Sequence, residues 1–85
     1  MTTHEAGARL PYELDDALVE VLRERMTGEG WSVNRLAAAI GVQQPTLNRN
    51  LNGRGRLSVE EWERIALALG EPGVEPLLEA ARRRL

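Results

Sequence analysis

Cysteine is absent from this chain of 85 residues, and so is lysine, which leaves arginine to supply all 11 basic side chains. The absence of cysteine excludes a disulfide framework, a cysteine metal site and a thiol nucleophile. Histidine occurs once, as His4 in a polar amino-terminal stretch, and we interpret it as a solvated tail residue. The sequence contains neither a phosphate-binding loop nor carboxylates that would converge on one site. We therefore expect no enzyme, no cofactor and no metal site.

Long hydrophobic runs are missing as well. No apolar run approaches the roughly 18 residues of a membrane span, and the amino terminus lacks the apolar core of a signal peptide. We expect a cytoplasmic protein. With 42% hydrophobic and 28% charged residues, the composition is typical of one small globular domain. Because no stretch alternates apolar and polar residues as a strand does, the expected fold class is all-α.

Acidic residues are missing from one long segment. None of the 13 acids lies between Glu29 and Glu60, so residues 30–59 carry a charge of +4. The whole chain is at −2, so the rest of it is strongly acidic. Local charge distribution matters more than net charge for binding nucleic acid, although a chance gap in the acids is the plainer alternative. The basic residues of this segment are Arg35, Arg49, Arg54 and Arg56.

A short helix is expected at the start of this cationic segment, just after Trp31, which we expect to pack into the core. Leu36 and Ile40 lie one turn apart, the spacing of one buried helix face. Ser32 is well placed to cap the amino end of the helix. Gly41 ends it, because glycine adopts the left-handed conformation that other residues resist.

A second short helix is expected over residues 44–51, where Pro45 is tolerated in the first turn and Gly53 signals a turn afterwards. A helix, a tight glycine turn and a second helix form a helix-turn-helix. At 100° per residue, Leu47 and Leu51 point into the core. The outward and edge positions contain no acid: they are Gln44, Pro45, Asn48, Arg49 and Asn52.

The chemistry of this outward face suits double-stranded DNA. Asn and Gln amides can pair bidentately with adenine and Arg with guanine in the major groove, whereas a proline offers only apolar contact. Arg54 and Arg56 flank Gly55, which would let the backbone approach a partner, and phosphate contact is their natural role. An ordinary polar surface is the alternative interpretation.

Three further helices are expected. The first spans residues 12–26, is broken at 27–30, and carries its acids on a solvated outer face, with Asp15 and Asp16 complementing the helix dipole. Its apolar face consists of Leu14, Leu18, Val21, Leu22 and Met26. Ahead of it, residues 1–11 are expected to form a flexible arm.

The other two helices follow the cationic segment. One begins at a capping box formed by Ser58 and Glu61, and the last spans residues 76–85. Residues 12–85 would thus form one domain with a carboxyl-terminal helix. The arm before it carries Arg9, which is placed to reach along a DNA groove, as such arms do in some helix-turn-helix proteins. The buried stripe of the fourth helix is expected to comprise Trp62, Ile65, Ala66 and Leu69.

At these spacings the chain resembles the Cro- and lambda-repressor-like (XRE) helix-turn-helix proteins. The resemblance covers about residues 14–69, and it implies a five-helix bundle whose third helix enters the major groove. Its strongest part consists of Ser32, Leu36, Ala37, Ile40, Gly41, Val42, Thr46, Leu47, Arg49, Asn52 and Gly53, followed by Ile65, Ala66, Ala68, Leu69 and Gly70.

The resemblance also assigns DNA contacts to individual residues. Base contacts carry over to Gln44, Pro45 and Arg49, with Asn48 beside them. Phosphate contacts carry over to the amino end of the second helix and to the end of the third helix with the loop after it. The implied phosphate-binding residues are Val33, Asn34, Asn52, Arg54 and Arg56.

The chain departs from the family pattern at three positions. Gln43 stands where the family usually has a Ser or Thr cap, so the start of the third helix would be held less tightly. Asn50 stands where many members bury an aliphatic side chain, and it is either hydrogen-bonded at the edge of the core or available to DNA. Pro45, at a base-facing position, is restricted to apolar contact.

The leading hypothesis is a sequence-specific transcriptional regulator, of phage type and acting as a repressor, that binds an inverted-repeat operator as a homodimer. Two-fold symmetry is expected because one recognition helix reads only a few base pairs. The last helix is the expected dimer surface, through Leu77, Leu78 and Leu85. The alternative is an antitoxin whose last helix holds a toxin partner. A toxin gene next door, or copurification with a partner, would distinguish the two.

Overall fold

The computed structural model describes residues 8–85, and within that range the chain forms five α-helices. The all-α, five-helix architecture expected from the sequence is confirmed. None of the helices in the described range is both long and apolar enough to cross a membrane. The helices are α1 (Tyr12–Glu29), α2 (Val33–Ile40), α3 (Gln44–Leu51), α4 (Val59–Ala68) and α5 (Glu75–Arg82).

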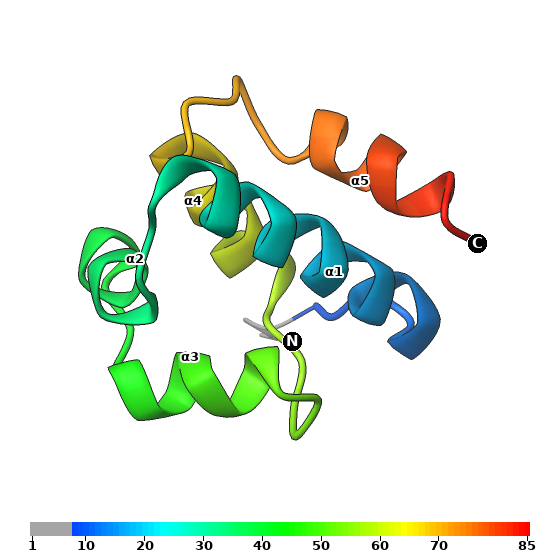
Figure 1. Ribbon diagram of the computed structural model, residues 1–85. Coiled ribbons are helices and arrows are strands. Elements are labelled where there is room, and N and C mark those ends of the chain that lie inside the picture. The colour runs from blue at the N-terminus through cyan, green and yellow to red at the C-terminus, as the bar shows by residue number, and fades with distance from the viewer. Residues whose placement is uncertain (1–7) are drawn as a thin grey trace.

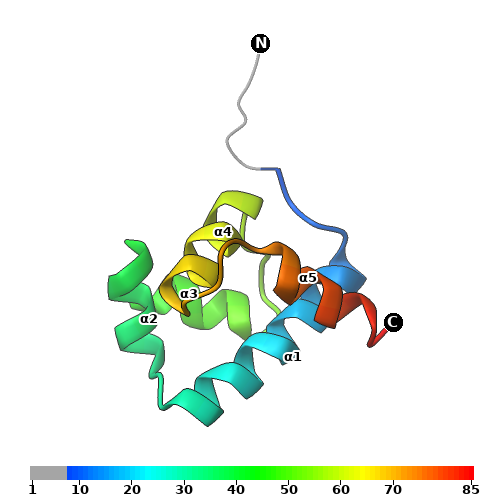
Figure 2. The same cartoon turned by 90° about the horizontal axis from the view of Figure 1, so that it is seen from above.

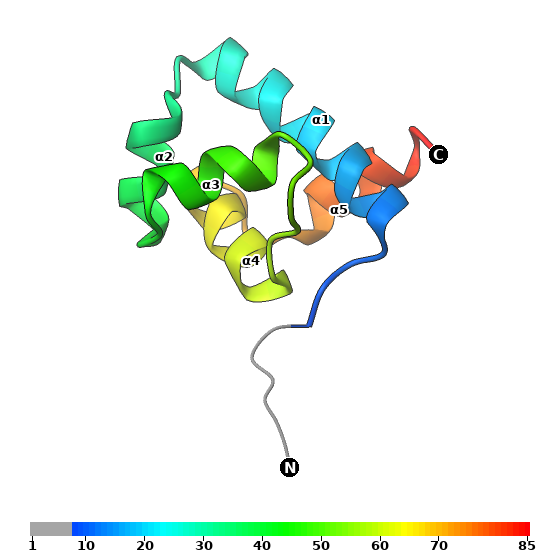
Figure 3. The ribbon, with the colours of Figure 1, turned by 90° about the horizontal axis from the view of Figure 1, so that it is seen from below.

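Helix α1 is the longest element, and it packs most extensively against α5. Helix α5 lies alongside α1 in two perpendicular views (Figures 1 and 2). Helices α2 and α4 pack together, and α3 lies along the outer edge of the molecule, where no other element covers it when the molecule is viewed from below (Figure 3). The core between the helices is mainly apolar. Its largest fully buried side chains are Trp62, Leu18, Leu22, Leu36, Leu47, Leu57 and Ile65.

Helix α1 is one turn longer than the sequence predicted. It continues through Gly28 and ends at Gly30, whose φ of 75° is left-handed. A glycine inside a helix costs only about 1 kcal/mol relative to alanine, and tertiary contacts offset that cost here. Arg25 forms ion pairs with Glu29 one turn on (2.6 Å) and with Glu71 beyond α4 (2.7 Å). These contacts hold the last turn of α1 against the end of α4.

The helix-turn-helix unit has the bounds expected from its local signals. The Ser32 hydroxyl accepts a hydrogen bond from the Arg35 backbone N–H (3.0 Å) and so caps α2. Gly41 has a φ of 78° and its N–H donates to the carbonyl of Ala37 (2.9 Å), which closes the helix. Gln43 occupies the N-cap position of α3 without a side-chain capping bond, as its departure from the family pattern implied.

Helix α4 begins at the expected capping box. The Ser58 hydroxyl accepts from the Glu61 backbone N–H (3.1 Å), and the Glu61 carboxylate accepts from the Ser58 N–H (2.8 Å). Of the stripe predicted for this helix, Trp62, Ile65 and Ala66 are fully buried. Both N-terminal caps that the sequence indicated, at α2 and at α4, are therefore confirmed.

The dimer surface predicted on the last helix is not available as proposed. Helix α5 spans Glu75–Arg82 rather than 76–85, and both Leu77 and Leu78 are buried in the core of the same subunit. Of the three predicted dimer residues, only Leu85 is exposed. Adjacent leucines can both be buried because α5 packs alongside α1, and the apolar face of such a helix is wide enough to include side chains 100° apart.

The amino-terminal segment is also more ordered than a flexible arm. His4 and the rest of residues 1–7 lie outside the described residues, but Ala8 and Arg9 pair with the start of α4. The Val59 backbone N–H donates to the Ala8 carbonyl (2.9 Å), and Arg9 forms an isolated antiparallel bridge with Ser58. The prediction of a free arm over residues 1–11 is therefore wrong for residues 8–11.

A buried carboxyl lies beneath this segment, in the first turn of α1. Asp15 is only 2% exposed and its Oδ1 accepts a hydrogen bond from Trp62 Nε1 (3.0 Å). The interpretation that the carboxylates of this helix form a solvated face is therefore wrong for Asp15. Burial raises the pKa of Asp15 above its ordinary value of 3.8, although the Trp62 hydrogen bond and the charges of Arg56 and Arg9 oppose that rise.

The raised pKa predicts how stability depends on pH. The folded protein keeps the Asp15 proton at pH values where the unfolded chain has already lost it, so the folded state loses stability as pH rises from 3.8 through the raised value. Urea unfolding across this range should show wild type losing stability relative to Asp15→Asn. The exposed Glu13 of the same turn provides the matched control Glu13→Gln, because the charge of Asp16 itself contributes to the raised pKa of Asp15. An Asp15→Asn curve parallel to that of wild type would contradict the prediction.

Candidate nucleic-acid interface

The four predicted base-reading residues lie together on the outer face of α3. Gln44, Pro45, Asn48 and Arg49 are all exposed, whereas Leu47 and Leu51 on the opposite face are buried, as predicted. The exposed side chains border a surface depression, which we call the base-facing hollow. It is lined by Gln44, Pro45, Asn48, Arg49, Asn52 and Arg54. The structure thus brings together the base-reading set and two of the predicted phosphate ligands.

The loop after α3 is held against the helix, which places Arg54 beside Arg49. Gly53 adopts a left-handed φ of 83°, and the Arg54 backbone N–H then folds back to the Arg49 carbonyl (3.0 Å). The side chains of both arginines are exposed. Two guanidinium groups therefore border the same acid-free surface, where a planar fork of N–H donors can meet a guanine edge or a phosphate.

Asn52 is held by a residue that lies well outside the cationic segment of the chain. Arg23, from the middle of α1, donates through Nη2 to the Leu51 carbonyl (2.8 Å) and to Asn52 Oδ1 (3.0 Å). A cation suits the negative end of α3, and this one also orients the Asn52 amide. No local signal could have revealed this role, because Arg23 lies 28 residues before Leu51.

The amino end of α2 carries two further predicted phosphate ligands, but these do not line the base-facing hollow. Val33 is half-buried and Asn34 is exposed in its first turn, where backbone N–H groups without helical partners favour an anion. The Arg35 guanidinium lies 3.8 Å from the centroid of the Trp31 ring. Trp31, which is partly buried against the core, therefore also positions a cation beside this helix end.

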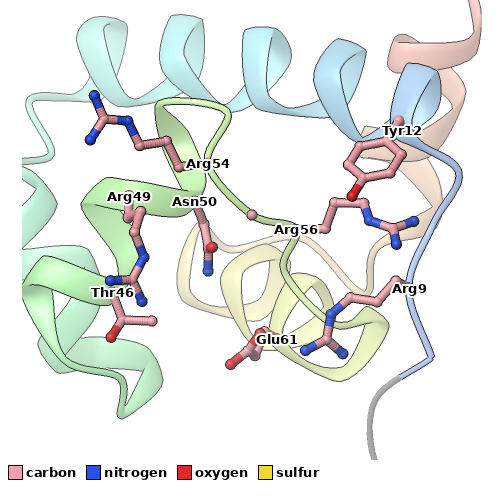
Figure 4. A pocket seen from close by; sticks show the side chains of 9 residues that line it. Arg9, Tyr12, Thr46, Arg49, Asn50, Arg54, Arg56 and Glu61 are labelled. Atoms are coloured by element: carbon pink, nitrogen blue, oxygen red, sulfur yellow. The ribbon is translucent and has the colours of Figure 1, made fainter.

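Arg56 is used differently from the other predicted phosphate ligands. Its Nη1 donates to the Leu10 carbonyl (2.7 Å), and its guanidinium lies 3.9 Å from the centroid of the Tyr12 ring. Figure 4 shows its side chain beside Tyr12, on the far side of the loop from Arg54. Arg56 therefore anchors the amino-terminal segment to the fold, a role that the sequence did not indicate.

Asn50 lies between α3 and the loop, half-buried beneath Gly55. A Cβ on Gly55 would overlap Asn50 Oδ1, so a larger residue there would require the Asn50 side chain to move. The close approach at Gly55 is therefore made by a side chain of the same subunit.

Comparison with known proteins assigns this architecture to a family. A family model described as a helix-turn-helix domain matches residues 17–83, which include all five helices except the start of α1. Neither the search of curated proteins nor that of solved structures returned a match. The matched region is most of the chain, and it contains the cationic, acid-free face of α3. The chain therefore belongs to the helix-turn-helix family and is a helix-turn-helix DNA-binding protein.

Proposed function

We propose that this protein is a sequence-specific transcriptional regulator of the Cro- and lambda-repressor-like type, which inserts α3 into the major groove and represses transcription from the site it covers. The observation that carries the proposal is the exposed face of α3, where amide and guanidinium groups gather without any acid. Gln44, Asn48 and Arg49 would read base edges. Arg54 and the amino end of α2 would bind phosphates and set the register of the helix.

The proposal includes two subunits on an inverted repeat. One α3 of eight residues reads few base pairs, and a second subunit doubles the number read. Leu77 and Leu78 are buried within one subunit. The two subunits would therefore be brought together largely by the duplex, which holds them on adjacent half-sites.

Selection of bound sites from random duplex DNA tests this function. The expected result is an enriched inverted repeat whose half-sites are separated by about one helical turn, or 10–10.5 base pairs. Mutation of one half-site should weaken binding sharply. If no sequence is enriched above the starting pool, the protein does not read bases.

The salt dependence of binding to the selected duplex provides a second measurement. Each phosphate neutralised contributes a slope of about 0.9 in the logarithm of affinity against the logarithm of salt. For two subunits, each presenting arginines and helix ends to the backbone, we expect a slope magnitude of roughly 3 to 8. A flat dependence would show that the cationic segment does not face DNA.

A further inference from the structure

A second hollow lies on the other flank of α3, between that helix, the loop after it and the amino-terminal segment. We propose that this hollow, here called the Arg9 hollow, binds a phosphate group and that Arg9 is one of its ligands. The identity of that phosphate as part of the DNA backbone rests on the proposed function. The lining residues are Arg9, Tyr12, Thr46, Arg49, Asn50, Arg54, Gly55, Arg56 and Glu61.

The charge of the Arg9 hollow favours an anion. Four of its nine lining residues are arginines and one is a glutamate, so its formal charge is +3. Guanidinium groups match the geometry of phosphate oxygens and form bidentate, charge-assisted hydrogen bonds with them. The Thr46 hydroxyl and Asn50 amide add neutral hydrogen-bonding groups. In Figure 4, Arg9 and Arg49 enter from opposite sides, with Asn50 and Glu61 between them.

The backbone that carries Arg9 is held in place before any ligand arrives. On one side, the Ala8 carbonyl accepts from the Val59 N–H (2.9 Å), and on the other, the Leu10 carbonyl accepts from Arg56 (2.7 Å). Neither bond uses the Arg9 side chain. The entropic cost of ordering this segment is therefore met within the fold, which favours binding by a preorganised group.

The position of the Arg9 hollow fits a DNA backbone. A helix in the major groove, which is about 12 Å wide, is bounded by a phosphate backbone on either side. Arg49 and Arg54 line both the base-facing hollow and the Arg9 hollow. The two hollows are therefore neighbours that share these arginines. A duplex whose bases face the base-facing hollow would place one of its backbones against the Arg9 hollow.

Removal of the Arg9 side chain tests the assignment. Arg9→Ala should weaken binding to all duplexes alike and lower the salt slope by about 0.9 for each bound subunit. Replacing single phosphates of the selected duplex with neutral methylphosphonates should reveal one position that weakens wild type but has no further effect on Arg9→Ala. Arg83→Ala is the matched control, since Arg83 is exposed beside α5 and lines neither hollow.

The carboxylate of the hollow allows a test in the opposite direction. Glu61→Gln removes the negative charge but keeps an oxygen that can accept from the Ser58 N–H, so the capping box of α4 is preserved. This variant should bind every duplex more tightly than wild type. The inference is overturned if Arg9→Ala and Arg83→Ala have equal salt slopes and equal methylphosphonate profiles.

A measurement with inorganic phosphate distinguishes a site for a DNA backbone phosphate from a site for free phosphate. With phosphate in place of chloride at matched ionic strength, a free-phosphate site would raise the melting temperature of wild type but not that of Arg9→Ala. A salt-slope change in Arg9→Ala without this thermal shift assigns the hollow to DNA. If wild type binds no duplex, the proposed function fails, yet the thermal shift still supports a phosphate site. The absence of both effects rejects the hollow as an anion site.

Discussion

Trp62→Ala is expected to lower the free energy of unfolding by about 3–5 kcal/mol. The Trp62 side chain is fully buried at the centre of the core, and its Nε1 donates to the buried Asp15 carboxyl (3.0 Å). Alanine would therefore leave a large cavity and also leave Asp15 without its donor. Small domains have only about 0.05–0.15 kcal/mol of stability per residue, so this change would consume much of the total. Urea unfolding monitored by far-ultraviolet circular dichroism measures the loss.

Two variants identify the source of that loss. Leu67→Ala removes a leucine that is 53% exposed on the same helix, and it should change the stability by less than about 0.5 kcal/mol. Trp62→Phe keeps most of the apolar volume but removes the indole N–H. Its loss of stability should therefore lie between those of Leu67→Ala and Trp62→Ala. Equal urea midpoints for Trp62→Ala and Leu67→Ala would show that Trp62 does not lie at the centre of the core.

Arg49→Ala and Gln44→Ala should each cost about 1–3 kcal/mol in binding to the selected duplex and relax the preference at particular base pairs. Both side chains lie exposed on the outer face of α3. Truncation would remove the bidentate base contact proposed for each side chain, so the loss should be confined to duplexes that carry that base. Binding titrations against the selected duplex and its single-base variants measure this preference.

Arg54→Ala is the companion variant that should behave differently. Its side chain lies on the loop beside α3, and its expected partner is a phosphate rather than a base. Affinity for all duplexes should fall alike, and the salt slope should fall by about 1 per subunit. If the consensus selected by Arg49→Ala matched that of wild type, the orientation assigned to α3 in the groove would be wrong.

The helix-turn-helix unit could be predicted from the sequence because its signals act over a few residues. Ser32 caps α2 through a backbone N–H three residues on, and Gly41 ends α2 through its own left-handed φ. The bounds of α3 depend in the same way on Pro45 and on the turn at Gly53. The outward face of α3 follows from helical periodicity once the inward position of Leu47 is known.

The tertiary structure alone decided which side chains of that surface are already engaged. Arg56 was expected to bind phosphate, but its partners Leu10 and Tyr12 lie more than 40 residues away in the chain. Arg23 contacts the end of α3 although 28 residues separate it from Leu51 in the chain. No periodicity within one helix encodes such pairings, because they arise only when α1 and the amino-terminal segment pack against the rest of the bundle.

The same distinction applies to burial. The apolar character of Leu77 and Leu78 was evident from the sequence, but whether they face a partner or their own core depends on where α5 lies against α1. From the sequence, Asp15 is interpreted as a charge that complements the helix dipole. The fold instead buries it against Trp62, which lies 47 residues further along the chain. Local hydrogen bonds and periodicity therefore determined the elements and the reading face. The depth of each side chain was decided by packing, which brings together residues that are distant in the chain.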